Sequence, residues 1–398
     1  DDPYARITEF KQLVSAYHEA GIRIVMDVVY NHMHSLRNND FEQIVPNYYF
    51  RYGPDGAPSN GSFCGNDFDS TRRMSRKFIV DSIKLWLREY HVDGFRFDLM
   101  GIMDIETMNE IVREAKKINP SVFLHGEGWN LPTMLAEHKK ATMGNQAALY
   151  GVAQFNDFFR EHVKGKSSDY ELGVCGYGTG DLNYRLAIPA CLCGSAVVKE
   201  GYVTLFDTPQ KSTNYIECHD NATVWDKMKN CCSEEASGVR IARQKMMTAM
   251  VLLAQGIPFL HSGQEFCRTK NGVTNSYASP DSVNRLDWDR KDRYLYVSDY
   301  VRDVIQLRKS HSEFRLKTTK EIEERVIIVI QENDLLVYTI KGSEPRETVR
   351  VLINPTNKPI VYRCKGLYRL ILDNKGMCKT EEKSVFTVPE LSLCVIER

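Results

Sequence analysis

The sequence predicts an α/β fold, with a (β/α)8 TIM barrel over residues 1–316 and a C-terminal antiparallel β-sandwich over residues 317–398. Two observations predict the barrel. Short apolar runs alternate with helical stretches, and polar side chains crowd the carboxyl ends of at least four successive runs. An open doubly wound sheet would instead gather its polar groups at one switch point. Beyond Arg315 the chain changes to short β-rich runs separated by turn residues, which is typical of a small sandwich.

The barrel elements are predicted in order along the chain. A helical stretch ends at Gly21 and leads into Ile22–Val29, an apolar run that we expect to be a strand buried on both faces. A loop rich in Gly, Asn, Pro and aromatic residues covers residues 33–70, and loops of this length are usually functional. Further strands are predicted at residues 94–98, 122–125, 150–155, 214–216 and 257–260. Helices are predicted around residues 79–90, 105–118, 241–254 and 301–307.

These six predicted strands are too few for a closed barrel, which needs eight. We therefore expect two more strands upstream of Asp1, in an N-terminal segment or a second polypeptide that completes the barrel. Without them the sheet edges would be exposed, and the chain should not be stable alone.

The composition suits a neutral substrate. Lys+Arg and Asp+Glu are equal at 52 each, and the sequence pI is about 7.2, which argues against nucleic acid or an anionic membrane as the main partner. The longest apolar run, residues 246–260, is interrupted by Gln255, Gly256 and Pro258, so no membrane span is expected.

The eleven cysteines are scattered, with Cys191-x-Cys193 and Cys231-Cys232 as the only close spacings. Neither spacing is that of a zinc site, and no regular disulfide framework is visible. Reduced thiols are the simplest interpretation, and they are typical of a reducing compartment or of an anaerobe. We expect a cytoplasmic protein.

The strand at residues 94–98 carries the first candidate site. Residues two apart on a strand share a face, so the Arg96 guanidinium and the Asp98 carboxylate should be neighbours. An arginine beside an aspartate keeps that aspartate ionised at neutral pH. An ionised, oriented carboxylate at a strand end meets the needs of a covalent glycosidase nucleophile. A purely structural ion pair is the alternative interpretation.

Four strand ends carry an ordered series of motifs. They are Asp27-Val28-Val29-Tyr30-Asn31-His32, Gly94-Phe95-Arg96-Phe97-Asp98, Gly126-Glu127-Gly128-Trp129 and Tyr215-Ile216-Glu217-Cys218-His219-Asp220-Asn221. This series resembles the four signature regions of the alpha-amylase superfamily (glycoside hydrolase family 13). Residues 94–101 and 126–129, with motifs in the long loop and at 263–282, resemble the type I pullulanase branch more closely.

The resemblance implies a retaining double displacement at an α-glucosidic bond. Asp98 would be the nucleophile, and Glu127 would be the general acid and then the base. Asp220 would hold the hydroxyls of the distorted sugar and stabilise the oxocarbenium-like state. Arg96 would orient Asp98.

The same resemblance implies substrate-binding residues around these carboxylates. His32 and His219 would hydrogen-bond the same glucose. Tyr30 and Trp129 adjoin the proposed catalytic groups, and aromatic faces suit the apolar faces of glucose rings. Asp27 is expected to support the site structurally. No role is assigned to Glu217, which lies three residues before Asp220 and should point away from it.

General chemistry supports the pairing of Asp98 with Glu127. A retaining enzyme needs two carboxyl groups ~5–5.5 Å apart, one ionised and one protonated. The two residues follow consecutive strands, so their positions should be adjacent. Trp129 offers Glu127 the apolar surroundings that favour the protonated form of a general acid.

The predicted function is hydrolysis of α-1,6 branch bonds in pullulan, limit dextrin or glycogen- and starch-type glucans. Leu99-Met100-Gly101 stands near the point where many α-1,4-acting amylases carry a lysine–histidine pair, which disfavours a plain amylase. An isoamylase, an α-1,4-acting amylase and a catalytically silent glucan-binding protein remain the alternatives.

No organic cofactor is expected, and nucleotide fingerprints are absent from the sequence. His32 and His34 form a His-x-His pair without a carboxylate at ligand spacing, which is weak evidence for a metal. The resemblance allows a structural calcium ion, although the spacing gives no set of oxygen ligands for it.

Overall fold

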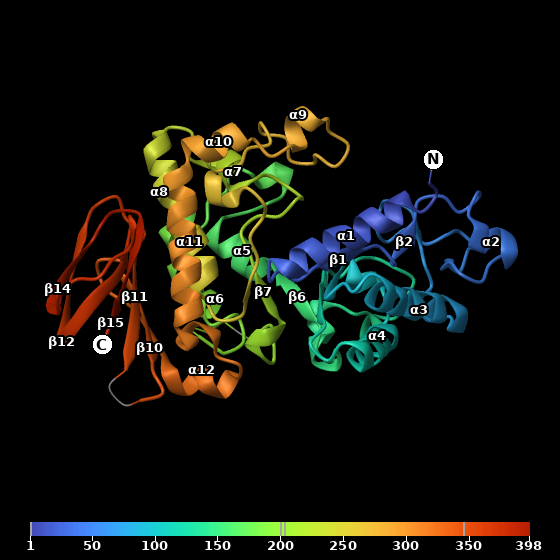
Figure 1. The fold of residues 1–398 in the computed structure, drawn as a ribbon, viewed down its shortest axis with the longest axis horizontal. Helices are drawn as coiled ribbons and strands as arrows, with labels where there is room; N and C mark the ends of the chain where they lie inside the picture. The colour runs from blue at the N-terminus through green and yellow to red at the C-terminus, as the bar shows by residue number, and fades with distance from the viewer. Residues whose placement is uncertain (1, 200, 203, 345–346) are drawn as a thin grey trace. The chain divides into compact units, whose positions relative to one another are not determined.

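The computed structural model describes residues 2–199, 201–202, 204–344 and 347–398. The chain divides into two compact units, Asp1–Phe155 and Asn156–Arg398, whose elements are labelled in Figure 1. In the described residues, no helix is both long and apolar enough to cross a lipid bilayer.

The first unit is built on parallel strands in the order β1-β4-β5-β6. Their bounds are β1 (Val25–Val28), β4 (Gly94–Phe97), β5 (Phe123–Gly126) and β6 (Ala153–Asn156), the last of which reaches one residue into the second unit. The helices are α1 (Ala5–Glu19), α2 (Asp40–Ile44), α3 (Arg73–Glu89) and α4 (Ile105–Ile118), with short 3-10 turns η1 (Met100–Ile102), η2 (Glu137–Lys139) and η3 (Met143–Ala148).

Helices α3 and α4 lie side by side, and each buries one apolar face (Figure 1). Ile79, Ile83 and Leu87 are buried at helical spacing on α3, as the sequence predicts. The side chain of Asp104 caps α4 by accepting a hydrogen bond of 2.9 Å from the Thr107 N–H. These contacts fix the helices that come directly before and after β4, the strand that leads into Asp98.

The strand predicted at residues 22–29 forms as β1 over Val25–Val28, and its burial on both faces stays a prediction, as do the two further barrel strands. Within the described residues, β1 lies at one edge of its sheet and pairs with β4 alone. Val25 is 40% exposed, and Val29, just past the strand, is 54% exposed. The long loop at 33–70 also contains more structure than expected, because β2 (His32–Met33) pairs with β3 (Asn66–Asp67) inside it.

The second unit contains the parallel pair β7 (Ser212–Asn214) and β8 (Ile257–Pro258) and most of the helices. The helices are α5 (Asp157–Val163), α6 (Ile188–Leu192), α7 (Val224–Cys231), α8 (Ser237–Leu253), α9 (Asp281–Asn284), α10 (Trp288–Arg293), α11 (Leu295–Ser310) and α12 (Thr319–Arg325). The 3-10 turns are η4 (Asp169–Glu171), η5 (Tyr177–Thr179), η6 (Leu182–Ala187), η7 (Pro209–Lys211), η8 (Gln264–Phe266) and η9 (Ser312–Arg315).

The C-terminal part of the second unit is antiparallel. Its strands run in the order β13-β12-β15-β11-β10-β9, and β14 pairs with β12. The bounds are β9 (Val326–Ile330), β10 (Leu336–Lys341), β11 (Thr348–Asn354), β12 (Ile360–Asp373), β13 (Gly376–Met377), β14 (Lys383–Val388) and β15 (Ser392–Glu397). Parallel strands with helices followed by this antiparallel domain confirm the predicted fold class; the two strands expected to complete the barrel stay a prediction.

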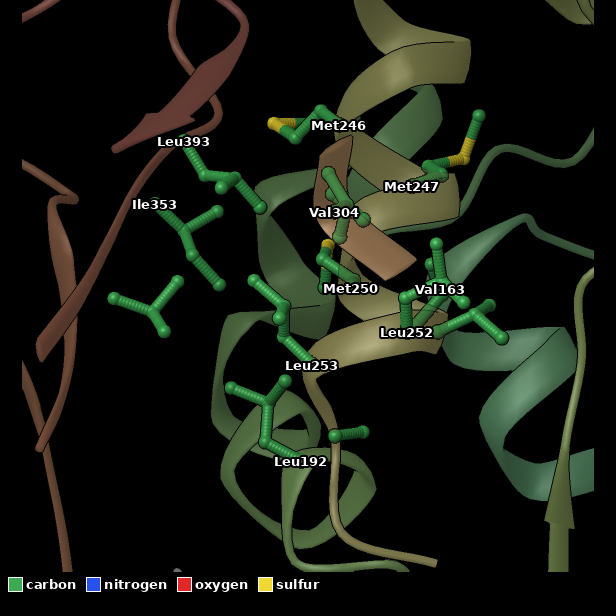
Figure 2. Close-up of a cluster of buried hydrophobic side chains, with 14 of the residues drawn as sticks. Val163, Leu192, Met246, Met247, Met250, Leu252, Leu253, Val304, Ile353 and Leu393 are labelled. Carbon is green, nitrogen blue, oxygen red and sulfur yellow. The ribbon is translucent and has the colours of Figure 1, made fainter. Parts of the chain in front are cut away.

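Both faces of the antiparallel sheet are buried, because alternate residues of each strand point in opposite directions. On one face, Ile353 and Leu393 pack against Met246 and Met250 of α8 and Val304 of α11 (Figure 2). The other face forms a separate core with the paired strands β12 and β14. The shared core explains why α8, α11 and the antiparallel sheet fall in one compact unit, and the predicted boundary at 316/317 lies inside it and stays a prediction.

Candidate active site

The centre of the candidate site is the buried guanidinium of Arg96, which contacts three carboxylates. Its Nη1 lies 2.9 Å from Asp27 Oδ1 and 2.9 Å from Asp98 Oδ1. Its Nη2 lies 2.6 Å from Glu127 Oε1. The predicted ion pair between Arg96 and Asp98 is confirmed, and Asp27 supports the site as expected.

Strand register explains this arrangement. Asp27 on β1, Arg96 on β4 and His125 on β5 are register partners across three neighbouring strands. Asp98 and Glu127 each come two residues after a member of this row, so their side chains emerge on the same side. One guanidinium therefore holds the two predicted catalytic carboxyl groups next to each other. Such closeness favours the ~5–5.5 Å separation of retaining glycosidases over the wider inverting one.

A neutral, apolar floor lies beneath the guanidinium. The Arg96 guanidinium lies 5.9 Å from the centre of the Phe155 ring, and that ring lies 5.1 Å from the ring of His125. Burial, with a smaller contribution from Arg96, lowers the pKa of His125 to about 3, so the imidazole is neutral at physiological pH. Burial alone would lower the pKa of Arg96, but the charges of Glu127, Asp27 and Asp98 outweigh it and raise that pKa.

Asp98 is oriented by a second side chain that the sequence prediction did not include. Asn31 is fully buried, and its Nδ2 donates to Asp98 Oδ2 at 3.0 Å and to the Asp98 carbonyl oxygen at 2.6 Å. The Asn31 Oδ1 lies 2.5 Å from His32 Nδ1, so the predicted substrate-binding histidine is linked to Asp98 through Asn31. Both carboxylate oxygens of Asp98 thus have fixed partners. Asn31 lies within the first motif, between two residues already singled out, but nothing in its spacing marks it as a contact of Asp98.

Glu127 is nearly buried and is held at both oxygens. Oε1 accepts from Arg96, and Oε2 accepts from the Leu99 N–H at 3.0 Å. Leu99 has a positive φ of 36°, a left-handed conformation that is uncommon for a leucine and turns its N–H toward Glu127. The sequence predicted apolar surroundings for this carboxyl group from Trp129, whereas the structure places a cation and a backbone donor at its two oxygens.

The two predicted aromatic residues are held by the fold in different ways. Trp129 is half-buried, and its carbonyl oxygen would lie only 1.9 Å from a Cβ placed on Gly101. This close approach explains the glycine in the motif that follows Asp98. The Tyr30 hydroxyl lies 2.7 Å from Ser82 Oγ on α3, so it forms a hydrogen bond within the fold. Burial raises the pKa of this hydroxyl.

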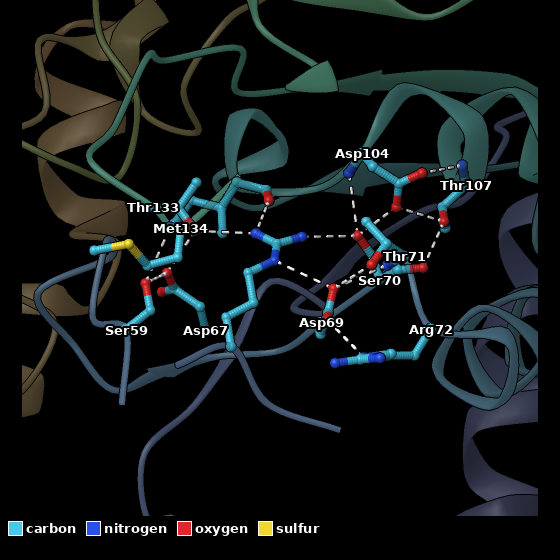
Figure 3. A network of polar contacts seen from close by, with 12 residues as sticks. Ser59, Asp67, Asp69, Ser70, Thr71, Arg72, Asp104, Thr107, Thr133 and Met134 are labelled. Atoms are coloured by element: carbon cyan, nitrogen blue, oxygen red, sulfur yellow. Dashed lines mark hydrogen bonds and ion pairs between the residues drawn. The ribbon is translucent and has the colours of Figure 1, made fainter. Parts of the chain in front are cut away.

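A buried polar network ties the long loop to the segments that follow Asp98 and Glu127 (Figure 3). Asp67 Oδ2 accepts from Thr133 Oγ1 at 2.6 Å, in the segment after Glu127. Arg51 Nη1 donates to the same Thr133 oxygen at 2.9 Å and to the Ile102 carbonyl at 2.6 Å, in the segment after Asp98. The network continues through Ser59, Asp69, Ser70, Asp104 and Thr107. The loop therefore positions both segments.

The third predicted carboxylate lies in the second unit. Asp220 and His219 follow β7 and precede α7, and His219 Nε2 lies 3.4 Å from Asp220 Oδ2. Both side chains are more than half exposed, at 60% for His219 and 53% for Asp220. The Lys270 ammonium donates to the His219 carbonyl at 2.9 Å, which fixes the backbone of this loop.

Glu217 has a structural place at the same strand end. Its side chain is fully buried, in contrast to that of Asp220. One oxygen accepts from the Val224 N–H at the start of α7 at 2.5 Å, and the other lies 3.1 Å from His261 Nδ1. A carboxylate at a helix N-terminus is stabilised by the helix dipole. Glu217 therefore fixes the start of α7, where the loop that carries Asp220 ends.

In the described part of the chain, one group of His, Cys, Asp or Glu side chains is close enough to hold a metal ion. It consists of Cys175, Cys231 and Cys232, and it contains none of the predicted site residues. The structural calcium ion that the resemblance allows stays a prediction.

Comparisons with known proteins show the family of the chain. The family described as "Alpha amylase, catalytic domain" matches residues 64–320. A pullulanase of Bacillus subtilis (strain 168) is 43% identical over 402 residues, covering 99% of this chain and 56% of the relative. The crystal structure of pullulanase type I from Bacillus subtilis str. 168 with maltose has a TM-score of 0.96 and 39% identity, covering 100% of this chain and 56% of that chain.

A second solved structure gives the same result. Pullulanase from Anoxybacillus sp. LM18-11 with maltotriose has a TM-score of 0.94 and 41% identity, covering 100% of this chain and 56% of that chain. The chain thus spans little more than half the length of these relatives. Since the family match extends over more than half of its residues, the chain belongs to the alpha-amylase family of glycoside hydrolases.

Proposed function

We propose that this chain carries the catalytic machinery of a debranching enzyme, which hydrolyses α-1,6-glucosidic bonds of pullulan, limit dextrin or glycogen- and starch-type glucans with retention. The observation that carries the proposal is the shared guanidinium of Arg96, which contacts Asp98 and Glu127 through different nitrogens. The similarity to pullulanases crystallised with maltose and maltotriose supports an α-glucan as the substrate.

In the first step Asp98 attacks the anomeric carbon of the bound glucose. The bond between that carbon and the leaving oxygen breaks, and a protonated Glu127 donates its proton to this oxygen. The product is a glycosyl ester on Asp98. Asn31 and Arg96 hold the two oxygens of Asp98, so the attacking carboxylate is oriented before the substrate arrives.

In the second step Glu127, now ionised, takes a proton from water as that water attacks the anomeric carbon. The ester bond breaks, the Asp98 carboxylate is restored, and two inversions give net retention. Asp220 is proposed to hydrogen-bond the distorted sugar, with His32 and His219 on the same glucose and Trp129 beside it. The Tyr30 hydroxyl contacts Ser82 on α3, so Tyr30 would offer the sugar only its ring. No organic cofactor enters either step.

The preference for branch bonds is supported by the residues after Asp98. Met100 is fully buried in the η1 turn, and Gly101 packs against the Trp129 backbone. The lysine–histidine pair of many α-1,4-acting relatives is thus replaced by apolar and small residues that belong to the core. An isoamylase activity is the second candidate, because it would use the same carboxylates on a larger branched substrate.

Digestion of pullulan and of linear amylose by the full-length protein tests the proposal. We expect maltotriose from pullulan, no cleavage of amylose, and loss of turnover in Asp98→Asn and in Glu127→Gln. Asp81→Asn is the matched control, because Asp81 is an exposed carboxylate of α3 paired with Lys77 and should leave activity unchanged. The anomer released first, followed by NMR, should be α.

Other outcomes would redirect the proposal. Cleavage of glycogen but not pullulan would favour an isoamylase, and cleavage of amylose alone would favour an α-1,4-acting amylase. Glucan binding without turnover, unchanged in Asp98→Asn, would leave a silent binding protein.

We also propose that the enzyme works in the cytoplasm. All eleven cysteines are free thiols, which supports a reducing compartment.

A further inference from the structure

Three cysteines that are far apart in the sequence converge in the second unit. Cys231 is the last residue of α7, Cys232 follows it, and Cys175 lies just before η5. Their sulfur atoms all lie within 4.8 Å of one another, and the Sγ atoms of Cys231 and Cys232 are 3.6 Å apart. The proposed hydrolysis uses none of these thiols.

The sulfur spacing fits a tetrahedral thiolate site. Zinc–sulfur bonds of about 2.3 Å at tetrahedral angles place neighbouring sulfurs about 3.8 Å apart, and a planar three-coordinate ion would spread them to about 4.0 Å. The Cys231–Cys232 separation of 3.6 Å is closer to the tetrahedral value, and the sulfur of Cys175 lies within 4.8 Å of both. It is far longer than the ~2.05 Å of a disulfide, so the vicinal pair is two separate thiols.

The charges around the cluster suit a divalent cation bound by three thiolates, which has a net charge of −1. The Lys227 ammonium, on α7, is held by the carbonyl oxygens of Lys166, Leu172 and Val174 at 2.8, 2.7 and 2.8 Å. Lys227 lies four residues before Cys231 on α7, so the two residues share a face of the helix. One lysine therefore balances the residual negative charge, and the C-terminal end of α7 adds a partial negative charge that favours a cation.

The cluster is open on one side. It borders a surface cleft of about 490 Å³ that is also lined by Asp181, Glu234, Glu235 and Arg243. Glu235 is held by Arg243 at 2.6 Å and is not positioned as a ligand. The cleft has ample room for a water molecule, whose share of liquid volume is about 30 Å³.

We propose that Cys175, Cys231 and Cys232 bind one zinc ion, with a water molecule from the cleft as the fourth ligand. The ion would join the segment before η5 to the end of α7. The other end of α7 receives Glu217 and lies four residues after Asp220. The ion is thus a structural clamp on the second unit and takes no part in the hydrolysis.

Zinc binding to the full-length protein, purified and kept under reducing, oxygen-free conditions, tests this site. After the protein is stripped with a chelator, we expect one equivalent of zinc to bind and to raise the Tm. Cobalt in place of zinc should give thiolate charge-transfer absorption and the intense visible bands of a tetrahedral ion.

Cys175→Ser should weaken zinc binding by more than about 100-fold and should abolish the Tm increase. Loss of a residue that contacts only a metal ligand costs up to roughly 100-fold, so a larger loss indicates a direct ligand. Cys231→Ser, also at a half-buried position, gives an independent variant should the first fail to fold. Cys64→Ser is the matched control, because Cys64 is exposed and lies in the first unit, and it should bind zinc as the parent does.

The proposal is overturned by failure of the parent to bind one equivalent of zinc, or by equal affinity in the parent and folded Cys175→Ser. It is also overturned if mass spectrometry finds two of these three cysteines joined as a disulfide in the reduced preparation. Hydrolysis of pullulan is measured separately, so failure of the zinc site leaves the proposed function standing.

Discussion

Removal of the Asn31 side chain tests whether Asn31 orients the nucleophile Asp98, beyond its contribution to the stability of the fold. Asn31→Ala deletes the donor that lies 3.0 Å from Asp98 Oδ2 and 2.6 Å from the Asp98 carbonyl. A hydrogen bond to a charged group contributes about 1.5–3 kcal/mol. Since ~1.4 kcal/mol is a tenfold change in rate, we expect kcat to fall about 10- to 150-fold on pullulan. Asn31→Asp should fall further, because it places a second carboxylate against Asp98.

The assay measures kcat and KM separately, from initial rates of reducing-end release over a range of pullulan concentrations. A loss of nucleophile orientation should lower kcat, because Asn31 holds Asp98. Asn31 also contacts His32, so a rise in KM would report the loss of that contact. Urea unfolding of the same preparations gives the free energy of unfolding.

Asn354→Ala supplies the matched control. Asn354 is as fully buried as Asn31, but it donates to the carbonyl oxygens of Lys358, Val388 and Pro389 in the antiparallel domain. Both variants should lose about 1–3 kcal/mol of stability, since each leaves buried partners unsatisfied. Only Asn31→Ala should lose kcat. A wild-type kcat in folded Asn31→Ala, or an equal loss in Asn354→Ala, would refute the reasoning.

Further predictions test the surroundings of the site. Gly101→Ala should destabilise the protein by about 3 kcal/mol or more in urea unfolding, because its Cβ would lie 1.9 Å from the Trp129 carbonyl oxygen; a stability loss below 1 kcal/mol would contradict this contact. Burial, aided by Arg96, lowers the pKa of His125 to about 3, below its unfolded value of ~6.5, so the unfolded state binds the extra proton. Stability should therefore be full above pH ~6.5 and fall by a few kcal/mol as pH decreases toward ~3, and His125→Gln should flatten this part of the pH profile. Thr133→Val removes a donor to Asp67 Oδ2 and should cost about 1–3 kcal/mol of stability, with an accompanying loss of kcat if the long loop positions the segment after Glu127.

Local rules predicted the parts of the site that lie on one strand or at neighbouring strand ends. The period of two along a strand placed Arg96 beside Asp98, and the structure has their atoms 2.9 Å apart. The burial of Ile79 and Ile83 on α3 followed from helical spacing in the same way. Such predictions succeed because the backbone geometry alone decides which side chains are neighbours.

Burial depends on neighbouring elements, which the same rules do not supply. The run at 22–29 has the Val- and Ile-rich composition of a central strand, whereas in the described residues β1 lies at a sheet edge and Val25 is 40% exposed. Composition indicates which environment a strand suits, and exposure depends on what packs against it. The count of six strands, too few for a closed barrel, is the sequence signal that bears on this difference.

Contacts between distant segments were the least predictable, and they carry much of the site's organisation. Asp27 and Glu127 come from strands on either side of Arg96, so a guanidinium shared by three carboxylates appears only once the strand order is known. The long loop was expected to be functional on length alone, and its role follows from Asp67 reaching Thr133. The cysteine cluster was unpredictable for the same reason. Cys231 and Cys232 do not have the spacing of a zinc site, and only the fold brings Cys175 next to them. Sequence spacing therefore predicts which site residues are neighbours when they lie on one element. When they lie on different elements, the arrangement of those elements must be known as well.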